Sequence, residues 1–493
     1  MSRLMKVKNS HSAQYTIIVL LITVVTLDGC SIWPEYMRPK TALPAQYAEA
    51  INEQTSNASQ ALVNDWWKLY QDPILDNLIA KSLQNNTDIK LAVARIEEAD
   101  AAMREVGAAL LPALDLNAAG TRSRVTEAGA FPVFAANPRN NYTTSLNTSF
   151  EIDFWGKLRQ AKNAARAQAL STRYAKDTVM LSLSSLVASN YLTLRSIDSQ
   201  IKIAADNLKS RKTSLSLTQR RLEGGVASGL DVHQAEVAVE VLTAQLADQQ
   251  RLRALTMQQL ALLTGTLDLQ LASADINALP IPPTPPVGLP SSLLDARPDV
   301  RQAEEAMIAA DANIAVAKAA LYPTISLTGA YGGESLALSD LLTTAARVWT
   351  GGLSLNLPIF NSGRLNSRVD QASARQKQAL ANYEASIRSA FTEVNSALVN
   401  LRQYTAREEA LNRGQMAAKK ALEVSENRYQ SGYSAYLDVL DAQRVYNDTA
   451  LSYTQSRQQR LVATVDLFKA LGGGWQANNK QAVSVSATEK KLN

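Results

Sequence analysis

Two hydrophobic periodicities alternate along this chain, and they predict two kinds of secondary structure. From Met180 to Leu208 apolar residues recur at spacings of three and four, and the same spacing returns from Ile387 to Tyr404. Such heptad spacing is typical of coiled-coil helices. It predicts a helix of about 65 residues from Lys157 to about Leu222, roughly 100 Å long at about 1.5 Å per residue. An equally long helix is expected in the second half.

Apolar and polar residues alternate in four shorter segments, at 114–118, 146–154, 325–327 and 353–359. A period of two residues indicates β-strands with one apolar and one polar face. The four strands would form two hairpins. Polar residues expected on one face of this sheet are Asn147, Ser149, Glu151, Asp153 and Asn356.

The whole arrangement occurs twice. The segment Arg221–Glu236 (RLEGGVASGLDVHQAE) matches Arg428–Arg444 (RYQSGYSAYLDVLDAQR) when shifted by 207 positions. AALLPALDLNAAG, which begins at Ala108, recurs as AALYPTISLTGAY from Ala319, 211 positions later. Glycine, proline and aspartate coincide in these matches as well as apolar residues, which indicates a duplicated chain rather than chance similarity between helices. A period near 210 is too long for a solenoid repeat.

The repeats predict the division of the chain. We expect a leader at 1–29, an extended arm at 30–64 and a first repeat at 65–271 with its hairpin at about 113–154. A proline-rich connector at 272–296 separates it from the second repeat at 297–475, whose hairpin lies at about 324–360. The polar tail, 476–493, is predicted to be disordered.

The N-terminus has the pattern of an export signal. Arg3, Lys6 and Lys8 precede an apolar run, YTIIVLLITVVT, which is shorter than the roughly 20 residues of a membrane-spanning helix. The run leads to Leu-Asp-Gly-Cys30, which resembles the bacterial lipobox in which the cysteine is acylated. Asp28 is an unusual residue inside that motif. With Ser31 after it, Cys30 is predicted to be a lipidation site that anchors the chain in the outer membrane.

Charge and composition exclude several classes of function. The net charge of +5 falls to +3 without the leader, which holds three cationic residues and Asp28, and this value is too small to indicate nucleic-acid binding. The chain has two histidines and one cysteine. We find no nucleophile elbow, zinc spacing or phosphate loop, and His233 stands where the second repeat has Leu440. We therefore expect neither an enzyme nor a cofactor or metal site.

Four strands cannot close into a barrel, yet an open sheet edge in lipid leaves backbone groups without hydrogen bonds. Bacterial barrels have at least about eight strands, so closure requires several chains, and three chains would supply twelve strands. Polar residues of the alternate face would then line a wet lumen. A soluble antiparallel sheet packed on helices is the alternative, but it explains neither the long helices nor the strand lengths.

Several motifs together resemble the outer membrane factor (TolC-like) family, and most closely its OprM-like lipoprotein (NodT) branch. They run the length of the mature chain: CSIWPEYMRP, NDWWKLYQDPILDNLI, RPDVRQAE, YPTISL, LPIF, YLDVLDAQR and LFKALGGGW. The resemblance implies a membrane α+β fold. Each chain of a homotrimer would contribute four strands to a twelve-stranded transmembrane β-barrel, continued through an equatorial region by a long α-helical coiled-coil barrel across the periplasm.

The same resemblance implies partners and a function. The partners would be a periplasmic adaptor (membrane fusion) protein, an inner-membrane pump of the resistance-nodulation-division (RND) type and outer membrane lipid. The chain would be the passive outer membrane conduit of a tripartite pump that exports drugs or other small toxic compounds. Alternatives are a lipid-tethered periplasmic scaffold without a pore, or a channel serving type I secretion or metal efflux. The scattered methionines and histidines disfavour copper or silver as cargo.

The resemblance also assigns a periplasmic gate to the second copy of the repeated motif. Its matching positions place the constriction at Leu437 and Asp441, with Arg444 one turn further on and Tyr429 just before the chain reversal. Leu437, Asp441 and Arg444 are spaced four and three apart, so they share one helical face. We expect Arg444 to pair with an acid of the neighbouring helix pair, for which Asp231 is the candidate.

Overall fold

The computed structural model describes residues 36–39, 44, 47, 65–128, 137–285 and 290–475. The predicted leader, the predicted lipidation site Cys30 and the tail at 476–493 lie outside the described residues. The described chain is mostly helical with four strands. It divides into two compact units, one of 1–39, 100–168 and 307–378, the other of 40–99, 169–306 and 379–493.

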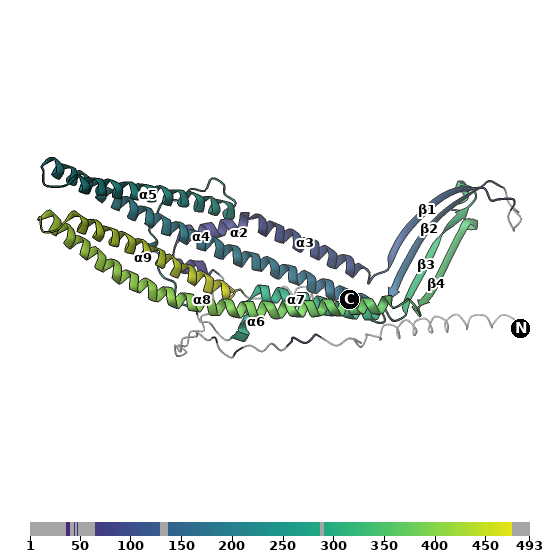
Figure 1. Ribbon diagram of the computed structural model, residues 1–493. Helices are drawn as coiled ribbons and strands as arrows, with labels where there is room; N and C mark the ends of the chain where they lie inside the picture. The colour runs from purple at the N-terminus through teal and green to yellow at the C-terminus, as the bar shows by residue number, and fades with distance from the viewer. Residues whose placement is uncertain are drawn as a thin grey trace, which may run out of the picture. The chain divides into compact units, whose positions relative to one another are not determined.

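The first unit contains a single antiparallel sheet in the order β1-β2-β3-β4 (Figure 1). The strands are β1 (Ala113–Ser123), β2 (Arg139–Ile152), β3 (Thr324–Ser335) and β4 (Arg347–Asn356). The four predicted strands are therefore present, and hairpins from the two halves pair through β2 and β3. In the described chain β1 and β4 each pair with one strand only, so the sheet has two free edges.

The register places apolar residues of all four strands on one face. Leu116 is opposite Leu146, Leu146 opposite Tyr331, and Tyr331 opposite Trp349. Four residues further along each strand, Phe150, Leu327 and Leu353 form a second row on this face. Ile152, Ile325 and Leu355 form a third row two residues beyond it. The opposite face carries Asn147, Ser149 and Glu151, as the alternation predicted. We call the first face the apolar face and the second the polar face.

Two predicted strand ends are wrong. Asp153 and Phe154 lie beyond β2, because the Asp153 carboxylate accepts the backbone N–H groups of Leu158 and Arg159, at 2.8 and 2.9 Å, at the start of helix α4. A carboxylate favours a helix N-terminus, where N–H groups lack partners within the helix. Leu357 and Ile359 also lie beyond the last strand, which ends at Asn356 before Pro358, a residue that has no N–H to donate.

Nine helices and helical turns frame the two repeats in the described residues of the helical regions. The first repeat has η1 (Trp66–Tyr70), α2 (Pro73–Asn85), α3 (Thr87–Ala108), α4 (Lys157–Glu223) and α5 (Gly229–Thr264). The second has α7 (Pro298–Ala319), α8 (Arg364–Gln430) and α9 (Tyr436–Ala470), and α6 (Leu293–Ala296) lies at the end of the connector. The connector holds the short turns η2 (Ile276–Ala278) and η3 (Pro290–Ser292), while η4 (Leu338–Asp340) and η5 (Thr344–Ala346) lie between β3 and β4.

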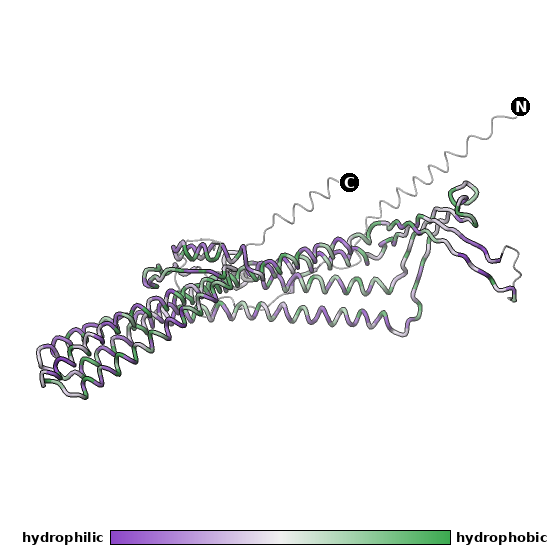
Figure 2. Tube along the Cα trace, turned by 90° about the horizontal axis from the view of Figure 1, so that it is seen from above, coloured by the Kyte–Doolittle hydropathy of each residue, from purple (hydrophilic) through white to green (hydrophobic). Residues whose placement is uncertain are grey.

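Helices α4 and α8 are the two long helices that the heptads predicted, with 67 residues each. Figure 2 shows hydrophobic and hydrophilic segments alternating along the helices. The predicted seam is buried at Leu183, Val187, Leu194, Ile197 and Ala204 in α4. In α8 it is buried at Ile387, Ala390, Val394, Ala397 and Leu401. Burial of these stripes, rather than the propensity of single residues, is what stabilises such long helices.

The main core of the second unit lies where the helices meet η1 and α2. Trp66 stacks on Phe468 with ring centroids 5.5 Å apart, and Tyr70 donates from its hydroxyl to the Leu461 carbonyl at 3.1 Å. Leu75, Ile79 and Leu260 complete the cluster. The core therefore ties the start of the first repeat to the end of the second.

Candidate functional site

The two helix reversals that carry the repeated motif have the same local geometry. Gly225 and Gly432 adopt left-handed backbone angles, with φ of 72° and 81°. The N–H groups of Val226 and Tyr433 each reach back five residues, to the carbonyls of Arg221 and Arg428, both at 2.8 Å. This arrangement ends a helix with its last carbonyls satisfied, and glycine adopts it without strain.

Asp231 and the N-cap residue Ser228 together cap helix α5, which begins after the first reversal. Its backbone N–H donates to the Ser228 hydroxyl at 3.2 Å, and its carboxylate accepts the Ser228 N–H at 2.9 Å. Such a capping box satisfies two N–H groups at once. Within one chain, Asp231 thus has a local structural role.

Arg444 bonds to acids of its own helix. Its guanidinium donates to Asp441 at 2.6 Å and lies 3.6 Å from Asp448. The hydrogen bond to Asp441 raises the pKa of Arg444 above its ordinary value. The side chains of Arg444 and Asp441 are 63% and 62% exposed, and Leu437, one turn earlier, is exposed too. The three residues share one open face of α9, as their spacing predicted. The predicted pairing of Arg444 with Asp231 stays a prediction.

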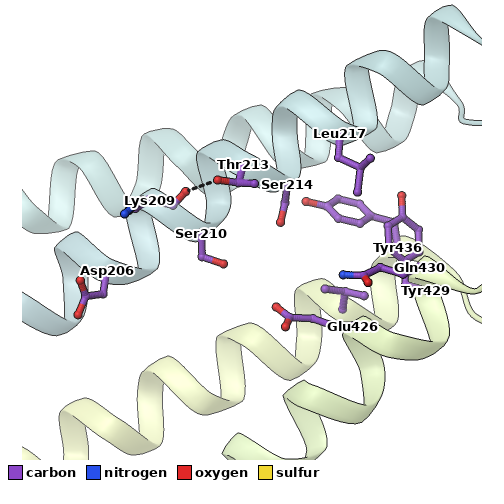
Figure 3. Close-up of a pocket in the computed structure, with 11 residues that line it drawn as sticks. Asp206, Lys209, Ser210, Thr213, Ser214, Leu217, Glu426, Tyr429, Gln430 and Tyr436 are labelled. Carbon is purple, nitrogen blue, oxygen red and sulfur yellow. Dashed lines mark hydrogen bonds between the residues drawn. The ribbon is translucent and has the colours of Figure 1, made fainter.

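Tyr429 links the two reversals. The Arg221 guanidinium lies over its ring at 4.4 Å from the centroid, and the ring of Tyr436 lies 5.4 Å away. Tyr436 is buried with Val439 and Ala235 in a small cluster. Figure 3 shows Tyr429 and Tyr436 beside Leu217 in a cavity of about 370 Å³ between α4 and the helices of the second reversal.

A series of polar contacts joins α4 to α9 and was missed in the sequence. Gln458 donates to Thr193 at 3.1 Å and Gln455 to Gln200 at 3.4 Å. The side chains of Asn207 and Asn447 form a third hydrogen bond. Thr193, Gln200 and Asn207 are spaced seven apart, so they occupy the same heptad position. This polar heptad is the signal that could have revealed the contacts.

Arg211 continues the series toward the reversal. Its guanidinium reaches the Leu440 carbonyl at 3.5 Å. Burial lowers the pKa of Arg211 below its ordinary value. Burial raises the pKa of Tyr436, and the positive charge of Arg211 partly offsets this rise. Hydrogen bonds between uncharged amides can exchange partners without leaving a charge unpaired. Helix α9 is thus joined to α4 by polar contacts in addition to the apolar contacts of the buried core.

A groove of about 760 Å³ lies between α5 and α9 next to these contacts. Its walls carry Leu230, Val237 and Val241 from α5, and Leu437 and Leu440 from α9, with Arg444 at its edge. These five apolar residues give the groove a largely hydrophobic lining.

The described residues contain no group of three or more His, Cys, Asp or Glu side chains that could hold a metal ion. Across the same described ranges, no helix has both the length and the apolar character that crossing a membrane requires.

Comparison with known proteins identifies the class. The family model for outer membrane efflux proteins matches residues 78–266 and 289–473, which together cover most of the chain. The chain is 33% identical over 479 residues to the probable efflux pump outer membrane protein TtgC of Pseudomonas putida, covering 96% of this chain and 99% of that protein. It is 32% identical over 453 residues to the cation efflux system protein CusC of Escherichia coli, covering 92% and 97%.

A solved structure gives the same result. The open-state MtrE outer membrane channel of Neisseria gonorrhoeae superposes with a TM-score of 0.82 at 31% identity, covering 91% of this chain and 99% of that one. The chain belongs to the outer membrane efflux protein family. It is the outer membrane channel component of an efflux pump, and it spans the periplasm.

Proposed function

We propose that three copies of this chain close their sheets into one twelve-stranded transmembrane barrel, continued by a barrel of the long helices. The observation that carries the proposal is the sheet itself. It has two free edges, and Leu114, Leu116, Leu353 and Leu355 are exposed on its apolar face. Free edges cannot persist in lipid, where each unsatisfied backbone group costs several kcal/mol. Pairing of β1 with β4 of the next copy would remove both edges.

The strand lengths and the aromatic residues support a membrane position. The strands have 10 to 14 residues, against the about 9 to 11 that a tilted transmembrane strand needs. Tyr331 and Trp349 lie toward one end of the apolar face. Near the other end, Trp155 stacks on Tyr322 at 4.8 Å. Aromatic girdles of this kind flank the lipid-facing band of outer membrane barrels. The polar face, with Asn147, Ser149 and Glu151, would line the lumen.

At the periplasmic end we assign the constriction to Leu437 and Asp441. Three copies would place three carboxylates and three leucine side chains around one axis, which favours cations and allows the constriction to dewet. In the closed state Arg444 would pair with Asp231 of a neighbouring helix pair. Opening would break that pair and leave Arg444 with Asp441 and Asp448 of its own helix. Exposed ion pairs are screened by solvent, so these latches are weak enough for a partner protein to release. Tyr429, held by Arg221, would keep the second reversal against α4.

The partners we propose are a periplasmic adaptor and an inner-membrane RND-type pump, with Cys30 acylated in the outer membrane. The cargo we propose is drugs or other small toxic compounds, because relatives in Pseudomonas putida are named as antibiotic and toluene efflux pump proteins. Metal cations are the second candidate, because a relative of similar identity is named as a cation efflux protein. Expression in a host lacking its own efflux channels, together with the cognate pump and adaptor, would separate the two cargoes. Inhibitory concentrations should rise for organic compounds; a rise for copper or silver alone would reverse the assignment.

The gate is tested by single-channel recording in planar bilayers. Arg444→Ser together with Asp231→Ala should raise conductance, and Asp441→Asn should reduce cation selectivity. The matched control is Asp248→Asn, because Asp248 forms the same kind of exposed pair with an arginine three residues on, at 2.8 Å, but lies far along α5. The gate assignment would be refuted if the Asp441 and Asp248 variants behaved alike, or if the double variant left conductance unchanged.

A further inference from the structure

The loop between β3 and β4, residues 336–346, is unusually apolar for the end of a hairpin. Seven of its eleven residues are leucine or alanine, and Asp340 is its only charged residue. Leu336 and Leu338 are exposed, and Leu342 is 84% exposed. Clustered exposed apolar side chains usually mark a contact with another molecule or with a membrane.

The loop is folded rather than extended. It contains the turns η4 and η5, and the Asp340 carbonyl accepts both the N–H and the hydroxyl of Thr343, at 3.0 and 2.7 Å. The N–H of Ala346 donates to the Thr343 carbonyl at 3.2 Å. The loop therefore presents its leucines from a defined backbone.

Gly333 fixes where the loop lies. A Cβ atom at this position would come within 2.2 Å of the Leu341 carbonyl oxygen, so the loop backbone rests directly on the glycine. Gly333 follows Tyr331 by two residues, and alternate residues of a strand point to the same face. At the same level the polar face holds Glu334, which accepts the Asn141 side-chain amide at 2.9 Å. The loop thus folds back over the apolar face, beyond the row that Tyr331 and Trp349 share.

We propose that the loop is a lipid-binding surface, with Leu336, Leu338 and Leu342 among the acyl chains of the outer leaflet at the rim of the barrel. The surface adjoins the apolar face, on which Trp349 is itself 76% exposed. Arg347, opposite Gly333 in the register, lies between them, and its long side chain can keep the guanidinium at the lipid headgroups. Insertion would extend the lipid-facing band beyond its aromatic row. The inference rests on the proposed barrel, because only a membrane-embedded apolar face gives the loop lipid to contact.

The competing arrangement is that the three loops of a trimer turn inward and meet over the mouth of the pore. A nitroxide spin label at Leu342→Cys in lipid vesicles distinguishes the two. The accessibility of the label to oxygen, which concentrates in acyl chains, would be compared with its accessibility to a water-soluble nickel chelate. Labelled Leu353→Cys on the apolar face and Ser354→Cys on the polar face are the references, and the wild type, whose only thiol is at Cys30, gives the background.

The Leu342 label should resemble the Leu353 label, with no dipolar broadening between labels of sister chains. Nickel accessibility like that of the Ser354 label would overturn the proposal, and so would broadening that shows the loops meeting at the axis. If the Leu353 label itself were as accessible to nickel as the Ser354 label, the barrel would fail and not only the loop.

A second pair of variants tests the role of Gly333. Gly333→Ala should displace the loop and raise the nickel accessibility of the Leu342 label. The control is Gly351→Ala, because a Cβ there meets nothing within 4 Å, and it should leave the label unchanged. Equal accessibility in both variants would contradict a loop that rests on the apolar face through Gly333.

Discussion

Replacing Asp198 by alanine should destabilise the helical unit far more than replacing an exposed aspartate. The Asp198 side chain is 1% exposed and joins three segments of the chain. Its carboxylate accepts from Arg253 of α5 at 2.7 Å, from Arg195 of α4 at 3.4 Å, and from the N–H of Ala274 in the connector at 3.1 Å. The alanine variant leaves two arginines without their carboxylate, and Arg195 is also 1% exposed.

The magnitude follows from that burial. Removing one partner of a buried pair costs about 3 to 5 kcal/mol, because it leaves an uncompensated charge. The exposed pair of Asp441 and Arg444 is screened by solvent, so its loss should destabilise the protein far less. Asp198→Asn retains the shape of the side chain and some of its hydrogen bonds. It should therefore destabilise the protein less than Asp198→Ala but more than Asp441→Ala.

The assay is the thermal midpoint of helix loss, followed by circular dichroism of the purified protein in detergent. Asp198→Ala should lower the midpoint by about 5 °C or more. Asp441→Ala, the matched control, should change it by about 2 °C at most. Equal shifts for the two variants would refute the reasoning that burial, and not the ion pair as such, sets the energy.

Three further outcomes are expected. Burial raises the pKa of Tyr47 to about 12, so as the pH rises the unfolded chain loses this proton before the folded chain does. Stability should therefore fall as the pH rises from about 10 to 12, and in alkaline melting curves Tyr47→Phe should make that fall smaller. Gly472 has φ 87° and a Cβ would lie 2.0 Å from the Ala296 carbonyl oxygen, so Gly472→Ala should lower the melting temperature, whereas Gly414→Ala, in open space, should not. Trp475 donates to Asp177 at 3.1 Å, so Trp475→Phe should cost about 1 kcal/mol in denaturant titrations, and no loss would show that the bond contributes nothing.

Periodicity predicted most of the fold. The heptads of α4 and α8 and the alternation of Leu114–Ala118 depend on local geometry, so the sequence alone identifies these elements. The ends of the strands were harder to predict from the sequence. Asp153 fits the polar positions of the strand pattern, and only its contact with an N–H group of α4 shows that it lies outside the strand. The competing principle was helix capping, which acts over a few residues and leaves the period-two pattern unbroken.

The site was predicted less completely. The face shared by Leu437, Asp441 and Arg444 follows from spacing within one helix. The contacts of Asn207 with Asn447 and of Arg211 with the Leu440 carbonyl join residues more than 200 positions apart, and no local pattern relates such pairs. The position of Leu341 on Gly333 depends likewise on how a loop folds back, and composition alone does not show it.

If sister copies seal the free edges of this four-stranded sheet, the protein is a trimer. Native mass spectrometry of the protein released from detergent micelles counts the chains in each particle. We expect three chains, and therefore twelve strands, in the stable species. A stable single chain, or a species with two chains, would contradict this expectation.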